Sequence, residues 1–318
     1  MASILRDVSQ SLAKRLITPY TLRLKATGLV PRASKEINDS VWGTITLSPL
    51  EVAVLDSPLL QRLRHLRQLG VAHWLYPGAS HSRFEHTIGV LHQVQQLIGA
   101  INRVSTTRFG RDIIPPAQQG VLRLAALMHD VGHPVLSHVS EFALKMDTTL
   151  LLEIQRYKQK AGEHVKLSEI VAAEIVRSQE FGELIDVILN DHQQKSIPIK
   201  LWNMDRKGLI ESTAKSILGQ TISNEVPLLH ELISGPFDAD KLDYMVRDCR
   251  AAGIPAILDI SRLVQKLTVR ACTKEQLPTR IAQHVDANVG QYYLCGHKNM
   301  VCYFSWAKYK SLWRSGHK

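Results

Sequence analysis

Hydrophobic residues recur every three or four positions through most of the chain, which predicts a mostly helical protein. The clearest run begins near residue 87 and contains Ile88, Leu91, Val94, Ile98 and Ile101. Further helical periods cover residues 166–178, 182–190, 226–233 and 239–251, and a buried helix ends near Asp130. The polar segment 191–224 has no clear period, so no structure is assigned to it.

Two segments before residue 80 carry different signals. Residues 57–70 predict a helix with Ser57 as the N-cap, Pro58 at the first helical position and Gly70 at the end. Alternation at Ile45 and Leu47 predicts a short strand or hairpin. The fold class expected from these patterns is all-α, with minor short strands.

The composition is that of a soluble globular protein, with 45% hydrophobic and 21% charged residues in 318 positions. The sequence has no apolar run long enough to span a bilayer and no signal peptide, so we expect a cytoplasmic protein without a membrane partner. The four cysteines are unclustered, which favours a reducing compartment over a disulfide framework.

The net charge of +10 suits a polyanionic partner such as a nucleotide or a nucleic acid, although a basic enzyme can carry this charge without such a role. Much of the charge excess lies in residues 1–37, which we interpret as a basic N-terminal arm. Such an arm could bind nucleic acid, but a solvated terminus or an oligomer contact is the favoured reading.

Three polar clusters lie beside apolar helical segments: His81 to His86, the pair His129 and Asp130, and Asp238 to Tyr244. Imidazole nitrogen and carboxylate oxygen are ligands for divalent metals. A single core histidine is more often a hydrogen-bonded structural residue, but three such clusters together favour a metal site.

The residues around these clusters carry a family resemblance. "SPLEVAVLDSPLLQRLRHLRQLG", "YPGASHSRFEHTIGV", "AALMHDVGHPVLSH" and "DADKLDYMVRDCRAAGI" resemble the HD-domain superfamily of metal-dependent phosphohydrolases. Within it they resemble the deoxynucleoside triphosphate (dNTP) triphosphohydrolases, both the catalytic core of the animal SAM-and-HD-domain enzymes and the bacterial dGTPase-like enzymes. The resemblance implies a catalytic core over residues 38–255, followed by a short extension over residues 256–318. It also implies that dNTPs are hydrolysed to deoxynucleoside and triphosphate, and that the chain forms homo-oligomers.

The resemblance further implies one divalent metal per site, such as iron, manganese, magnesium or zinc. Its ligands would be His86, His129, Asp130 and Asp240. Two imidazoles and two carboxylates leave positions open for water and a phosphate oxygen, and the cation would lower the pKa of that water.

By the same resemblance, His138 is the catalytic histidine and would activate the nucleophile or protonate the leaving group. Glu141 occupies the position of its acidic partner, where the animal enzymes have aspartate. His133 matches a histidine that lies near the phosphates, and His164 matches a further active-site histidine.

The implied substrate contacts begin with Arg83, whose guanidinium suits phosphate oxygens. Gln68 and Leu69 match positions against the deoxyribose, where a 2′-hydroxyl would not fit. Further phosphate and sugar contacts would come from Lys241, Tyr244 and Asp248. Because Asp240, Tyr244 and Asp248 are spaced by four residues, they share one helix face, which agrees with a common site. A surface helix with salt bridges would show the same spacing.

One departure from the family pattern lies outside the ligand set. The family's "DPVHG" is "DSVWG" in this chain, so that Trp42 replaces a histidine.

Two other functions remain open. HD proteins also cleave phosphodiesters, cyclic nucleotides and nucleoside monophosphates, and the pocket of this chain could accept such ligands or a nucleic-acid end. A nucleotide sensor or nucleic-acid-binding module without turnover would also fit the basic charge.

Overall fold

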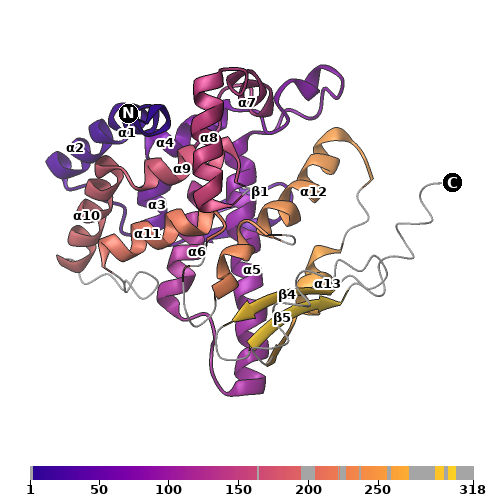
Figure 1. Ribbon diagram of the computed structural model, residues 1–318. Helices are drawn as coiled ribbons and strands as arrows, with labels where there is room; N and C mark the ends of the chain where they lie inside the picture. The colour runs from indigo at the N-terminus through magenta and orange to yellow at the C-terminus, as the bar shows by residue number, and fades with distance from the viewer. Residues whose placement is uncertain are drawn as a thin grey trace.

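The computed structural model describes residues 3–162, 165–194, 205–220, 222, 227–235, 238–255, 259–271, 291–296 and 300–305. It is mostly helical, which confirms the predicted fold class. The longest helix, α5 (Arg83–Phe109), runs through the middle of the molecule (Figure 1). Helices α6 (Pro116–Met128) and α12 (Ala239–Ala252) pack against α5.

The remaining helices surround this centre. They are α3 (Pro49–Leu55), α4 (Pro58–Gln61), α7 (His138–Leu144), α8 (Thr148–Ala161), α9 (Leu167–Val176), α10 (Gln179–Gln194), α11 (Arg206–Ile217) and α13 (Ile260–Gln265), together with the 3₁₀ segment η4 (Pro227–Leu232). Helix α11 falls in the polar segment that has no clear hydrophobic period.

The N-terminal segment is part of the core rather than a solvated arm. It forms α1 (Ile4–Leu16) and α2 (Thr18–Thr27). Leu5, Ile17, Tyr20 and Leu24 are buried in the same apolar core as α5, α6 and α9. Burial of apolar side chains therefore holds this segment in place, while its basic residues remain at the surface.

The helix predicted over residues 57–70 is wrong in length. Helix α4 gives way to the 3₁₀ segment η1 (Arg62–His65), and a second 3₁₀ segment, η2 (Gly70–Trp74), starts where the helix was expected to end. Between them, the amide N–H of Gln68 donates to the carbonyl of His81, and that of Arg83 donates to the carbonyl of Leu66. These pairings compete with helix continuation.

The strands lie outside the helical centre. The predicted hairpin is confirmed as the antiparallel pair β1 (Lys35–Asp39) and β2 (Gly43–Leu47). A second sheet has the order β3 (Thr268–Ala271), β5 (Met300–Ser305) and β4 (Gln291–Gly296), with antiparallel neighbours. Within the described ranges, no helix combines the length and the hydrophobicity needed to cross a membrane.

Candidate active site

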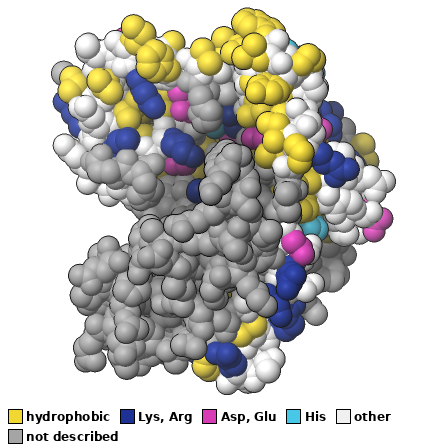
Figure 2. Space-filling model, turned by 90° about the vertical axis from the view of Figure 1, so that its right-hand side faces the viewer, with side chains coloured by type: hydrophobic (Ala, Val, Ile, Leu, Met, Phe, Trp, Pro, Cys, Tyr) yellow, Lys and Arg dark blue, Asp and Glu magenta, His cyan; other side chains and the backbone are white. Residues whose placement is uncertain are grey.

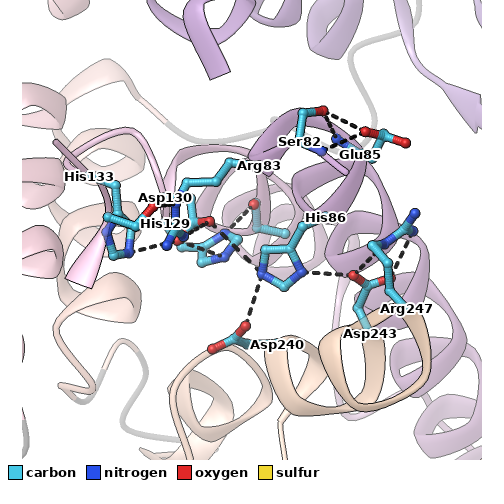
Figure 3. A network of polar contacts seen from close by, with 12 residues as sticks. Ser82, Arg83, Glu85, His86, His129, Asp130, His133, Asp240, Asp243 and Arg247 are labelled. Carbon is cyan, nitrogen blue, oxygen red and sulfur yellow. Dashed lines mark hydrogen bonds and ion pairs between the residues drawn. The ribbon is translucent and has the colours of Figure 1, made fainter. Parts of the chain in front are cut away.

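Three helix ends meet at one polar cluster (Figure 3). Helix α5 begins with a capping box, in which the side chains of Ser82 and Glu85 each accept a hydrogen bond from the other residue's backbone N–H. This box presents Arg83 and His86 in the first turn. His129 caps the end of α6, and Asp240 lies in the first turn of α12. The sequence clusters predicted to form a metal site therefore converge in space.

His86 lies between two carboxylates. Its Nδ1 donates to Asp243 Oδ2 at 2.7 Å, and its Nε2 lies 3.0 Å from Asp240 Oδ1. Burial lowers the pKa of His86, but the hydrogen bonds to Asp240 and Asp243 outweigh it and raise the pKa to about 10. The same imidazole holds the pKa of Asp240 at about 2, against the opposing effect of burial. Nε2 of His86 thus points at a position that strongly favours positive charge.

His129 presents a second imidazole nitrogen to the same position. Its Nδ1–H donates to the Ala126 carbonyl at 2.7 Å, and its Nε2 is buried without a hydrogen-bond partner among the described residues. This backbone contact selects the tautomer in which the Nε2 lone pair is available to a metal.

Asp130 completes a set of ligands that fits a divalent metal. One donor atom each from His86, His129 and Asp130 lies within 4.8 Å of the others, and Asp240 is adjacent through His86. Two buried imidazole nitrogens with carboxylate oxygens form a donor set for such ions. The buried Nε2 of His129 and the charge-stabilising surroundings of His86 both support this fit. A cation bound here would replace the proton that His86 shares with Asp240.

Arg83 is buried beside this cluster and retains one available donor. Its Nη1 donates to Asp130 Oδ2 at 2.7 Å and its Nε donates to Ser137 Oγ at 2.9 Å, while Nη2 has no hydrogen-bond partner in the described part of the chain. Burial alone would raise the pKa of Asp130, but Arg83 and the nearby histidines hold it well below its usual range. Ser137 has φ of 52°, an unfavourable backbone conformation for a serine, and its hydroxyl donates to the Arg67 carbonyl.

The candidate catalytic residues are only partly described. His133 Nε2 lies 3.3 Å from Asp130 Oδ1, and its Nδ1 lies 3.3 Å from Glu141 Oε1. Burial lowers the pKa of His133 despite Asp130. His138 is the first residue of α7, but its side chain lies outside the described part of the structure, and so does the whole of His164. The expected pairing of Glu141 with His138 is therefore untested, whereas a contact of Glu141 with His133 is present.

A cavity of about 860 Å³ opens over the metal-binding cluster. Its lining includes the residues expected to bind substrate, namely Arg83, Gln68, Leu69, Lys241, Tyr244 and Asp248. Lys241 Nζ is held at 2.6 Å from both the Gly235 carbonyl and Asp238 Oδ2. Asp248 Oδ1 lies 2.8 Å from His81 Nε2, and no described residue donates a hydrogen bond to the buried Oε1 of Gln68.

Two groups at this site were not predicted from the sequence. Lys166 and Glu169 line the cavity, and their side chains lie 3.5 Å apart. Burial lowers the pKa of Lys166, but Glu169 and Asp240 outweigh it and raise it, so the ammonium adds positive charge to the cavity. Asp243, one turn after Asp240, was assigned no role. Its spacing of four residues to Arg247 and of three to Asp240 is the signal that could have identified it.

Residues 83–245 match the HD domain family. The chain belongs to the HD domain family. The match runs from Arg83 at the start of α5 to α12, and so includes every residue of the metal-binding cluster. The predicted divalent-metal cofactor is confirmed to this extent: the chain has an HD domain, and its His–His–Asp cluster can bind such an ion.

The chain is similar to several known proteins. It is 29% identical over 311 residues to the deoxynucleoside triphosphate triphosphohydrolase SAMHD1 of Danio rerio, covering 92% of this chain and 46% of that protein. The human SAMHD1 is 28% identical over 81% of this chain and 39% of its own length. A putative HD domain-containing protein, L394, of Acanthamoeba polyphaga mimivirus is 26% identical over 84% of this chain and 54% of its own length. The chain thus spans less than half the length of these two SAMHD1 relatives.

A solved structure shares the fold. The crystal structure of a hypothetical protein from Aquifex aeolicus superposes with a TM-score of 0.54 at 26% identity. The superposition covers 74% of this chain and 52% of the other.

Proposed function

We propose that this protein is a metal-dependent dNTP triphosphohydrolase that releases deoxynucleoside and triphosphate. One observation carries the proposal. The cluster able to bind a divalent metal forms part of the wall of a cavity whose lining also contains the arginine, the glutamine and leucine, and the tyrosine expected to contact phosphate and deoxyribose. The named SAMHD1 relatives support the same substrate class.

The proposed reaction is attack of water on the α-phosphorus. A new P–O bond forms to the water oxygen, the bond from phosphorus to the ribose 5′ oxygen breaks, and that oxygen takes up a proton. A divalent cation held by His86, His129, Asp130 and Asp240 would supply charge that polarises a phosphoryl oxygen and lowers the pKa of water. The protein groups would orient the phosphates and move the protons.

Arg83 is the proposed phosphate clamp. Because Asp130 and Ser137 hold two of its nitrogens, the guanidinium is fixed before substrate arrives, and its Nη2, which contacts no acceptor among the described residues, can donate to a phosphate oxygen. Lys166 and Lys241 add positive charge to the same cavity. Carboxylates outnumber these cations in the cavity lining, so we expect a polyphosphate to bind together with a divalent cation that offsets their charge.

His138 is the proposed proton-transfer group, as the family resemblance implies. His133 would orient Asp130 through its Nε2, and Glu141 lies close to its Nδ1. We retain His164 as a further proposed active-site residue.

The proposed catalytic unit is residues 38–255, with the two N-terminal helices as structural support. We also propose that the chain self-associates. Exposed hydrophobic side chains are concentrated in segments 74–76 and 135–146, including Trp74, Val135, Phe142 and Met146. Figure 2 shows hydrophobic side chains gathered on the upper part of one face. Sedimentation velocity would test this, and a strictly monomeric chain at micromolar concentration would contradict it.

The activity test uses each of the four dNTPs with Mn²⁺, Mg²⁺, Fe²⁺ or Zn²⁺, and identifies products by chromatography and mass. Release of triphosphate and deoxynucleoside is expected, and it should be lost in Asp130→Asn. Asp112→Asn is a matched control, because Asp112 is exposed and contacts only Thr106 among the described hydrogen bonds. Cyclic nucleotides, nucleoside monophosphates and single-stranded oligonucleotides belong in the same panel. Faster turnover of any of these than of every dNTP would refute the substrate assignment.

A further inference from the structure

The β1–β2 hairpin reaches the metal-binding cluster through one carboxylate. Trp42, in the turn of the hairpin, donates its indole Nε1–H to Asp243 Oδ1 at 2.5 Å. The other oxygen of Asp243 accepts the Nδ1–H of His86 at 2.7 Å. A single buried side chain therefore separates the hairpin from an imidazole of the cluster.

The hairpin is itself held against α12 by a second contact. Arg247 donates from Nε and Nη2 to both oxygens of Asp243, and its Nη1 lies 2.9 Å from Asp39 Oδ2. Asp39 Oδ1 accepts the backbone N–H of Trp42 at 2.9 Å. The contacts close a ring through Asp39, Arg247, Asp243 and Trp42. Asp243 is fully buried within it, and Arg247 is 2% exposed.

This ring leaves Asp243 with a defined orientation. Each oxygen accepts one hydrogen bond from Arg247, which leaves Oδ1 for the indole and Oδ2 for His86. The indole N–H is a donor only, so it cannot compete with Asp243 for the proton of His86. With Trp42 in place, the carboxylate is directed so that His86 keeps its proton on Nδ1 and turns Nε2 toward Asp130 and Asp240.

We propose that Trp42 is a positioning residue for the metal site and acts on His86 through Asp243. The inference rests on the proposed function only in taking His86 as a metal ligand. Partners of this kind fix the ring orientation and tautomer of a ligating histidine and so tune metal affinity. In this chain, a residue in the hairpin supplies that control.

The test measures Co²⁺ binding to the full chain by calorimetry and by visible absorption of the bound ion. Trp42→Phe keeps an aromatic ring but removes the donor, and it should weaken Co²⁺ binding about 10-fold and alter the absorption bands. Trp42→His restores a ring N–H and should recover part of the affinity. Thr44→Val is the matched control in the same hairpin, because Thr44 is exposed and its hydroxyl contacts Asn38 rather than Asp243.

A double-mutant cycle separates positioning from a general packing effect. Asp243→Asn should weaken Co²⁺ binding by itself, and adding Trp42→Phe to it should cost less than about 2-fold more, because the route from the indole to His86 is already broken. Melting of the metal-free variants, followed by circular dichroism, checks that each is folded.

Several results would overturn the inference. They are an unchanged Co²⁺ affinity and spectrum in Trp42→Phe, or a full additive loss in the double variant. If Trp42→Phe fails to fold, unchanged binding in Asp243→Asn would overturn it as well. The absence of Co²⁺ binding by the unaltered protein would overturn this inference and the proposed function together. A protein that binds Co²⁺ normally but cleaves no dNTP would refute the substrate assignment and leave the positioning role standing.

Discussion

Gly89 tests the packing of α12 against α5, because helix propensity and tertiary structure predict opposite outcomes for Gly89→Ala. The residue lies in the interior of α5, one turn after His86. In an exposed helix interior, alanine is more favourable than glycine by about 1 kcal/mol. Here a Cβ on Gly89 would lie 1.8 Å from Asp243 Oδ1 and 2.4 Å from Arg247 Nη2.

The size of the effect follows from these distances. Cβ atoms essentially never approach another atom within 3.0 Å, so the Asp243 carboxylate must retreat by more than about 1 Å in a closely packed interior. That movement stretches its hydrogen bonds to Trp42, His86 and Arg247. Disrupting the pairing of this buried carboxylate costs about 3–5 kcal/mol, so a net loss of roughly 2–4 kcal/mol remains after the gain in helix propensity.

The assay is urea unfolding of the metal-free protein, with Gly99→Ala as the control. Gly99 is in the same helix and is exposed, and a Cβ added to it would meet no described atom within 4 Å. Gly99→Ala should therefore stabilise the protein by about 0.5–1 kcal/mol. Gly89→Ala should also weaken metal binding, because Asp243 no longer holds His86. If Gly89→Ala were as stable as Gly99→Ala, the close approach of Asp243 to α5 would be refuted.

Three further predictions concern the cavity. A chelator should lower the melting temperature of the unaltered protein, because bound metal at 100 times its Kd adds about 2.7 kcal/mol to the free energy of unfolding. The melting temperature of Asp130→Asn should not change. An equal chelator effect on both proteins would contradict the ligand role of Asp130. Arg83→Lys should lower kcat/KM for dNTPs about 100-fold or more, because an ammonium cannot contact Ser137, Asp130 and a phosphate together, and near-normal kinetics would exclude the clamp. Burial raises the pKa of Glu231 from 4.5 to about 7, so the folded state favours the protonated carboxyl. Below pH 4.5 the carboxyl is protonated in both the folded and the unfolded state, so it does not lower the free energy of unfolding. As the pH rises through 7, the free energy of unfolding should fall by at most about 3 kcal/mol, because the folded state must then bury the charged form. Glu231→Gln should not show this fall. Parallel stability profiles for the two proteins would refute the raised pKa.

Much of the fold could be predicted from the spacing of hydrophobic residues where one face of a helix is apolar. The long run in α5 and the alternation in the β1–β2 hairpin were predicted, because each pattern reports burial directly. Residues 57–70 show the limit of this reasoning. Their helical pattern is interrupted where Gln68 and Leu66 pair with the backbone of residues 81–83, and such pairing between distant segments leaves no local signal.

The candidate site was likewise predicted only in part from the sequence. Residue type and family pattern alone singled out His86, His129, Asp130 and Asp240, since imidazoles and carboxylates beside apolar helices are costly unless they serve a purpose. Only the tertiary structure decided which atoms face the common position, through the Ala126 carbonyl on His129 and the Asp243 carboxylate on His86. These partners are backbone groups or side chains far away in sequence.

The sequence by itself therefore determined which side chains are available as metal ligands and which helix faces are apolar, because donor atoms and helix faces are properties of residue type and spacing. The tertiary structure decided how those groups are aimed. In the linear chain Trp42 is only a departure from the family pattern, and Gly89 carries no signal. Their roles arise because folding brings α5, α12 and the hairpin into contact around Asp243.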